Sequence, residues 1–168
     1  VDKALALAAR STHVLVFVAT PSQEGMDRDN LTLTNQCQTI ASSGGAVPLP
    51  VCSNDALRSV DQDSLITRVV AAHGDRTAVI AVTPGALLTP WAAEGLTSNG
   101  ARPRGAAAVL IPFMPGQGYG LAIASILFGD KNPTGRLPVT FPMSETQQMI
   151  SVAQYPGYEN NNHLTQMP

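Results

Sequence analysis

The residues best placed to do chemistry in this chain lie in the segment 21–33, which contains Glu24. This segment follows the apolar run 13–19, whose valines and phenylalanine predict a strand. In open α/β sheets, ligands bind beyond the carboxyl ends of the strands. A carboxyl side chain at such a place could donate a proton to a ligand or remove one from it. The position alone fits two interpretations: a reactive carboxyl at a ligand site, or a solvated carboxylate in a surface loop.

Three helices would help to position this segment. Helix-forming residues and apolar spacing predict them at 2–10, 61–73 and 119–128. Asp61 or Asp63 would cap the second helix, Gly74 would end it, and Gly129 would end the third. The second helix places four apolar residues on one face: Leu65, Ile66, Val69 and Val70.

The expected strands are continuous apolar runs at 13–19, 77–82 and 106–112. Such runs, separated by helices, are typical of a parallel sheet covered on both faces. We therefore expect an α/β fold, a three-layer α/β/α sandwich with a mostly parallel sheet. A short last strand is predicted at 137–141, where Pro138 restricts it to an edge or a strand start.

Two segments depart from this alternation. Residues 34–60 are rich in Ser, Gly, Pro and Asn and predict a long inserted loop, whereas 143–168 predict a polar C-terminal arm. The domain proper would comprise residues 1–142. The inserted loop carries Cys37 and Cys52, which are either two separate thiols or a disulfide. Closing such a loop would stabilise the fold by roughly 3 kcal/mol and would imply an oxidising compartment.

Composition excludes several classes of function. Of 168 residues, 44% are hydrophobic and 13% charged, which is typical of a folded domain. The net charge of −2 offers no footprint for nucleic acid or acidic membranes. The sequence shows no apolar run of the roughly 18 residues that span a bilayer, no signal-peptide pattern, no glycine-rich phosphate loop and no metal-ligand spacing. It begins at Val1 rather than Met, as expected of a processed or excised chain.

Several separated motifs occur in a consistent order. They are Glu24-Gly-Met-Asp-Arg28 with Leu31 and Leu33, Gln62-Asp-Ser-Leu-Ile66, Thr83-Pro-Gly85, Pro90-Trp91, Pro115-Gly-Gln117 and Asn132-Pro-Thr-Gly-Arg-Leu-Pro-Val-Thr-Phe-Pro142. Together they resemble glycoside hydrolase family 3, which includes β-glucosidases and β-xylosidases. The resemblance covers residues 1–142 outside the inserted loop, and the final motif is the most specific.

The family usually joins a (β/α)8 barrel, which supplies an aspartate nucleophile, to an α/β sandwich that supplies the acid/base glutamate in many members. The resemblance implies that this chain is the sandwich domain and that Glu24 is the acid/base. Gly25, Asp27 and Arg28 would be structural residues near it, Gly25 because it allows a tight turn beside the substrate. Retaining glycosidases need two carboxyl groups about 5–5.5 Å apart, so a barrel domain or partner chain is implied, but no cofactor or metal.

The implied function is hydrolysis of a terminal β-linked sugar with retention, by an exo-acting, β-glucosidase-like enzyme. This chain alone would be inactive. The alternative is a non-catalytic structural or interaction module descended from such an enzyme, which the inserted loop beside Glu24 also fits. Trp91 is either a sugar-stacking or a packing residue. If Cys37 and Cys52 are joined, the protein is expected to be secreted or lumenal.

Overall fold

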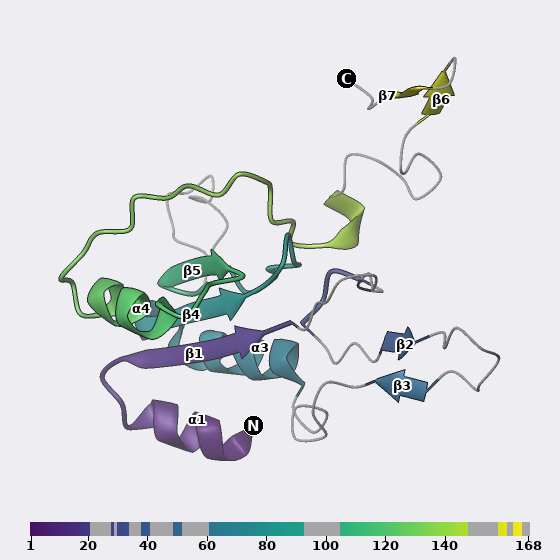
Figure 1. The fold of residues 1–168 in the computed structure, drawn as a ribbon. Helices are drawn as coiled ribbons and strands as arrows, with labels where there is room; N and C mark the ends of the chain where they lie inside the picture. Colours follow the sequence, from purple (N-terminus) through teal and green to yellow (C-terminus); the bar gives the residue numbers. More distant parts are fainter. Residues whose placement is uncertain are drawn as a thin grey trace, which may run out of the picture.

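A parallel sheet of three strands forms the centre of the protein. The computed structural model describes residues 1–20, 28, 30–33, 61–92 and 105–147, and the backbone of four short strands outside these ranges. The sheet has the order β1-β4-β5, from β1 (Val14–Ala19), β4 (Thr77–Val82) and β5 (Ala108–Phe113), with both pairs parallel (Figure 1). The α/β class and the parallel sheet expected from the apolar runs are confirmed.

Among the described residues, three α-helices accompany the sheet: α1 (Asp2–Ala9), α3 (Gln62–His73) and α4 (Tyr119–Leu127). Each begins and ends within one or two residues of its expected position. The Asp61 carboxylate caps α3 because it accepts a hydrogen bond from the Ser64 N–H at 3.0 Å. Two short 3₁₀ turns are also formed, η1 (Gly74–Arg76) and η2 (Glu145–Gln147).

The two glycines expected to end helices have different roles. Gly129 follows α4 with a φ of 83°, the left-handed conformation that favours glycine at a helix C-terminus. Gly74 instead has a φ of −58° and continues α3 into η1. A Cβ atom on Gly74 would lie 2.5 Å from the carbonyl oxygen of Gly105. The close approach of the chain at residue 105, rather than a left-handed turn, therefore requires glycine at position 74.

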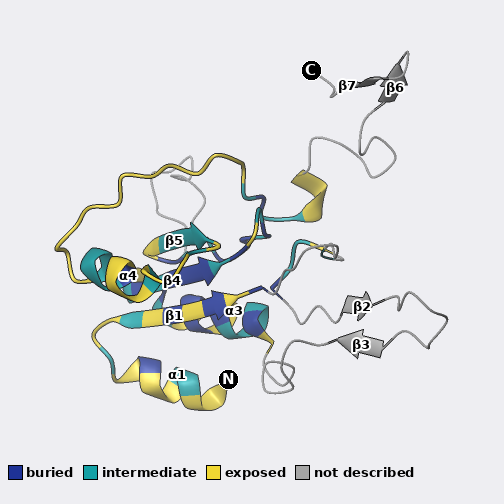
Figure 2. Ribbon diagram, viewed as in Figure 1, coloured by how far each residue is buried: buried dark blue, intermediate teal, exposed yellow. Residues whose placement is uncertain are grey.

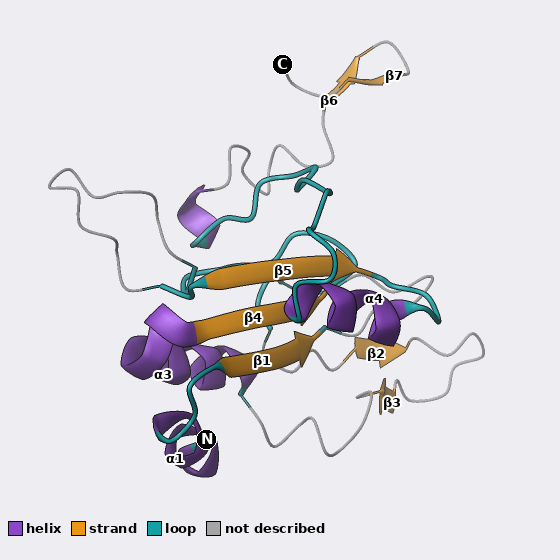
Figure 3. Cartoon of the chain, turned by 90° about the vertical axis from the view of Figure 1, so that its left-hand side faces the viewer, coloured by secondary structure: helices purple, strands orange, loops and turns teal. Residues whose placement is uncertain are grey.

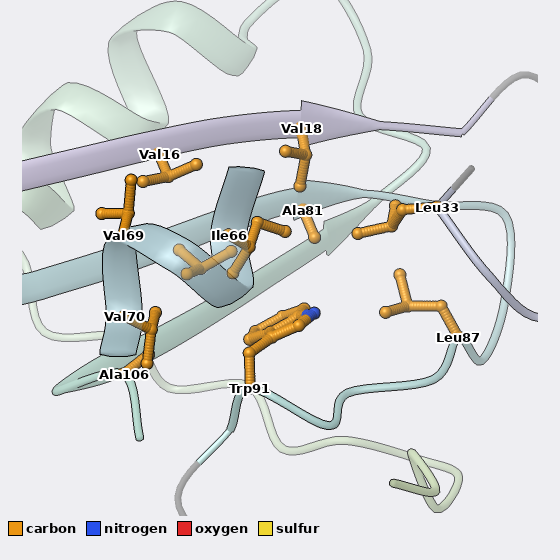
Figure 4. Packing of buried hydrophobic residues seen from close by; sticks show 11 residues of the cluster. Val16, Val18, Leu33, Ile66, Val69, Val70, Ala81, Leu87, Trp91 and Ala106 are labelled. Atoms are coloured by element: carbon orange, nitrogen blue, oxygen red, sulfur yellow. The ribbon is translucent and has the colours of Figure 1, made fainter. Parts of the chain in front are cut away.

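The main core lies between the sheet and α3. The central strand β4 is buried along most of its length, whereas alternate residues of β1 are exposed (Figure 2). Helix α3 presents the apolar face expected from its sequence. Figure 4 shows the resulting cluster, formed by Val16, Val18, Leu33, Ile66, Val69, Val70, Val79, Ala81, Leu87, Trp91 and Ala106.

The opposite face of the sheet is covered less completely. Figure 1 shows α4 in front of the sheet and α3 behind it, and Figure 3 again shows α4 in front of the strands. On this face Ile80 is fully buried, but its register partner Phe17 is 53% exposed and Leu15 is 48% exposed. Helices therefore lie on both faces, and the β1 side of the second face is open to solvent.

The expected strand at 137–141 is not formed, which corrects that part of the prediction. Pro138 has no N–H to donate to a ladder, and Leu137 and Val139 are about half exposed. The segment is attached through its end instead. The ring of Phe141 packs edge-on against Phe113 with centroids 6.3 Å apart, and the Pro142 carbonyl accepts from the Thr89 N–H at 2.8 Å.

Two further pairs of short strands are antiparallel. β2 (Gln38–Ile40) pairs with β3 (Leu49–Val51), and β6 (Tyr158–Asn160) pairs with β7 (His163–Thr165). The first pair lies within the segment expected as an inserted loop, which therefore contains two short strands. The second pair lies within the expected polar arm.

Candidate functional site

The candidate site lies where β1 and β4 end. Glu24, Gly25 and Asp27 fall outside the described residues, and the structure describes both ends of the segment that contains them. At the first end, the Thr20 N–H donates to the Val82 carbonyl at 3.0 Å and extends the β1-β4 pairing by one residue. At the second end, Leu33 is fully buried in the core. The segment thus leaves from the sheet and returns to the core.

The side chain of Gln62, the first residue of α3, contacts both ends of this segment. Its Nε2 group donates to the carbonyl oxygens of Ala19 and Leu33, each at 3.0 Å. Its Oε1 atom accepts from the Ala19 N–H, also at 3.0 Å. Gln62 is only 8% exposed, so water cannot satisfy its side-chain amide group. The three bonds to Ala19 and Leu33 do so instead.

The adjacent residue Asp63 holds the second end as well. Its Oδ2 atom accepts from the Leu33 N–H at 2.8 Å. Just before Leu33, the Asn30 Oδ1 atom accepts from the N–H and the hydroxyl of Thr32, at 2.9 and 2.6 Å, which forms a local turn. The backbone from residue 30 to residue 33 is therefore fixed by side chains of its own turn and of α3.

The turn after β4 packs against the same segment. The buried Thr83 hydroxyl donates to the Gly85 carbonyl at 2.8 Å and shapes this turn. The Leu88 N–H then donates to the Leu31 carbonyl at 2.7 Å. The chain after β1 and the chain after β4 are thus joined through their backbones at the carboxyl edge of the sheet.

Arg28 adds a charged contact at this edge. Its Nη2 group donates to the Ala86 carbonyl at 2.5 Å, while its Nη1 atom is buried without a hydrogen-bond partner among the described residues. Burial lowers the pKa of the Arg28 guanidinium, because desolvation disfavours its charged form. The Arg28 guanidinium therefore lies where the two segments meet, and among the described residues its Nη1 group has no acceptor. Such a group favours an anionic or carbonyl neighbour.

The Trp91 side chain is part of the hydrophobic core. It is 3% exposed, and Figure 4 shows its indole ring lying among Ile66, Ala81 and Leu87 in the core. A sugar cannot reach a ring that is enclosed in this way. The stacking interpretation is therefore not supported by the geometry.

The two cysteines of the expected disulfide cannot be placed, because Cys37 and Cys52 both lie outside the described residues. The described ranges contain no cluster of three or more His, Cys, Asp or Glu side chains that could hold a metal ion. They also contain no helix long and apolar enough to cross a membrane.

The sequence predicted the helix that begins at Gln62 but not the hydrogen bonds of the Gln62 side chain. The available signal was a glutamine directly after the N-cap Asp61, a place where a polar side chain can reach past the helix end. Its partners are distant in sequence, so spacing alone could not identify them. The described part of the site is a set of hydrogen bonds at the two ends of the segment that contains the expected reactive group.

The chain as a whole is similar in sequence to several known proteins. The sequence model described as the glycosyl hydrolase family 3 C-terminal domain matches residues 1–166. The chain is 27% identical over 167 residues to a probable beta-D-xylosidase 7 of Arabidopsis thaliana, a match that covers 94% of this chain and 18% of that protein. It is 34% identical over 103 residues to a beta-glucosidase of Rhizobium radiobacter, covering 60% of this chain and 11% of that protein.

A third relative is the probable beta-glucosidase I of Aspergillus terreus, which is 28% identical over 146 residues, or 85% of this chain and 13% of that protein. The chain thus spans less than a fifth of the length of these relatives. No solved structure matches it significantly.

Proposed function

This chain belongs to glycosyl hydrolase family 3, as a C-terminal domain matched over residues 1–166, and on that premise we propose that it is the acid/base-bearing domain of a retaining, exo-acting, β-glucosidase-like enzyme. The proposal rests mainly on one observation. The segment that contains Glu24 starts and ends at the carboxyl edge of the parallel sheet, where α/β domains bind ligands. The names of the relatives, a xylosidase and two glucosidases, support a terminal β-linked sugar as the substrate.

In the proposed mechanism Glu24 acts twice. Its carboxylic acid first protonates the glycosidic oxygen as the bond to the leaving group breaks, and an aspartate of another domain or chain forms the glycosyl-enzyme. The Glu24 carboxylate then removes a proton from the incoming water, which releases the sugar with retained configuration. Neither a metal nor a cofactor is needed for these steps.

The nucleophile is proposed to belong to a (β/α)8 barrel domain or chain. The length of the relatives leaves room for such a domain, because the chain covers 18% or less of each. The surface of the chain also suits a covering partner. Helix α4 is apolar on nearly all sides, and Leu121 and Phe128 are 82% and 84% exposed. An apolar helix with exposed large side chains is a common feature of interfaces.

The acid/base assignment can be tested in the full-length protein that carries this chain. Glu24→Gln should abolish hydrolysis of natural β-glucosides and slow that of aryl β-glucosides, without changing the circular dichroism spectrum or the Tm. Azide should restore turnover of an activated aryl glycoside, because azide attacks the glycosyl-enzyme without a general base. The matched control is Asp75→Asn, which removes an exposed carboxylate at the opposite edge of the sheet. Undiminished hydrolysis by Glu24→Gln would refute the assignment.

A second candidate function is a non-catalytic structural or interaction module. The observation that favours it is the segment 34–60, which follows the Glu24 segment directly in the chain and adds the β2-β3 pair. Such a module would bind β-glucosides weakly or not at all, and the full-length protein would hydrolyse none of them. Assays of the unmodified protein with aryl β-glucosides and β-xylosides therefore separate the two candidates.

We also propose that the protein is secreted or lumenal and that Cys37 and Cys52 form a disulfide. One relative, 46% identical over 59 residues, is named a lysosomal beta glucosidase of Dictyostelium discoideum. An oxidising compartment would permit the disulfide. The proposed domain comprises residues 1–142 and the proposed arm residues 143–168.

A further inference from the structure

We propose that Gln62 is a positioning residue for the acid/base, because its amide fixes both ends of the chain segment that carries Glu24. This inference rests on the proposed function for its catalytic consequence. Its structural basis is independent of that function. The three hydrogen bonds of the Gln62 side chain lie entirely within the described residues.

The geometry uses the full donor capacity of the amide. A glutamine side chain offers two N–H donors and one carbonyl acceptor group. Here one donor reaches Ala19 at the end of β1 and the other reaches Leu33, where the segment re-enters the core. The acceptor returns to the N–H of Ala19, so that residue is held through both its N–H and its carbonyl group. No other natural side chain of this length has the same pattern of donors and acceptor.

The attachment of Gln62 makes this arrangement rigid. Gln62 begins α3, whose Ile66 and Val69 are buried against the sheet. The Asp61 carboxylate caps the same helix end through Ser64, a bond within the helix rather than to the segment. The position of the Gln62 amide is therefore set by the helix and the core, and the amide transmits that position to both ends of the segment.

Loss of the Gln62 contacts should slow catalysis because proton transfer depends steeply on the distance between the Glu24 carboxyl group and the glycosidic oxygen. A displacement of about 1 Å at a reacting group can lower the rate by about a hundredfold. Without the amide, Ala19 and Leu33 lose a common anchor, although Asp63 still holds the Leu33 N–H. The chemical step should slow more than ground-state binding of the sugar, because the segment holds the proton donor.

The test compares Gln62→Met with Asp61→Ala in the full-length protein. Methionine has a similar length but can form none of the three bonds, whereas Asp61→Ala weakens the same helix end and leaves the three bonds of Gln62 in place. For Gln62→Met, kcat on a β-glucoside should fall at least tenfold while KM changes less than threefold. For Asp61→Ala, both should stay within about twofold. Equal loss in the two variants would show that Gln62 acts only through helix stability and would overturn the proposal.

Amide hydrogen exchange gives a readout that does not depend on activity. In Gln62→Met, the Ala19 N–H should exchange at least tenfold faster, while the N–H groups of Val79 and Ile80 in β4 remain protected. Unchanged exchange at Ala19 would show that the Gln62 amide does not hold the end of β1 and would overturn the proposal. This outcome is separate from the test of the proposed function by Glu24→Gln. If Gln62→Met does not fold, Gln62→Glu serves instead, since it retains the acceptor for Ala19 and loses the donors. It should show the same loss of kcat, and a wild-type kcat would refute the inference.

Discussion

Arg28 donates from Nη2 to the carbonyl oxygen of Ala86 at 2.5 Å and so joins the chain after β1 to the turn after β4. The contact brings a partly desolvated cation to the edge of the sheet where the segment containing Glu24 is held. Hydrogen bonds from charged donors are about twice as strong as neutral ones. This single side chain therefore contributes to the connection between the two segments in addition to the backbone bond between Leu88 and Leu31.

Arg28→Ala should lower the free energy of unfolding by about 1–3 kcal/mol, because it leaves the Ala86 carbonyl without its donor. The measurement is urea unfolding followed by tryptophan fluorescence, with Trp91 as the probe in the core. Arg10→Ala is the control, because Arg10 is exposed and should change stability by less than about 0.5 kcal/mol. Equal stability of the two variants would contradict the importance of the Ala86 contact.

Gly74→Ala should destabilise the fold by about 1–3 kcal/mol, since a Cβ there would clash with the Gly105 carbonyl oxygen at 2.5 Å. Gly118→Ala is a matched control, because nothing lies within 4 Å of the place where its Cβ would be and its φ is −76°. That control should be neutral or stabilising by up to about 1 kcal/mol. Thermal unfolding of both variants checks the difference, and a stable Gly74→Ala protein would show that the chain at residue 105 can move away.

Ile66→Ala should cost about 2–5 kcal/mol, because Ile66 is fully buried between α3 and the sheet and its loss leaves a cavity. The neighbouring Thr67 is exposed on the same helix, so Thr67→Ala tests the effect of altering α3 without altering the core. It should be neutral or slightly stabilising, since alanine favours helices. A cost below about 1 kcal/mol for Ile66→Ala would contradict the assignment of this face to the core.

The disulfide proposed between Cys37 and Cys52 should make the oxidised protein lighter by two hydrogens and remove both thiols from reaction with an alkylating reagent. Reduction should then lower the free energy of unfolding by up to roughly 3 kcal/mol. Intact-mass measurement with and without reductant checks the bond, and urea unfolding checks its energetic effect. Full alkylation without reductant would establish two separate thiols instead.

The sequence was sufficient to locate the helices and strands that depend on residues close together in the chain. Helix α3 could be located because Asp61 is a good N-cap and because apolar residues recur at helical spacing up to Val70. The strands β1, β4 and β5 are continuous apolar runs and could be recognised as buried parallel strands.

The errors and omissions arose from contacts between distant residues. The predicted strand at 137–141 has suitable residues, but a strand forms only where a neighbouring edge offers partners, and Pro138 removes one of its donors. The reason for glycine at position 74 depends on Gly105. The Gln62 contacts join residues from β1, α3 and the segment between them, so no periodic pattern marks them.

The position of β1 at the margin of the sheet has a practical consequence for handling this chain. Among the strands that the structure describes, β1 pairs only with β4, so its other side has no strand partner there, although the Gln62 side chain bonds the N–H and carbonyl of Ala19 at the end of β1. Leu15 and Phe17 add half-exposed apolar side chains along the same strand. Edges of this kind are templates for intermolecular strand pairing and aggregation. A soluble preparation for crystallography would therefore benefit from Leu15→Lys, which places a charge on the strand without altering its core-facing valines.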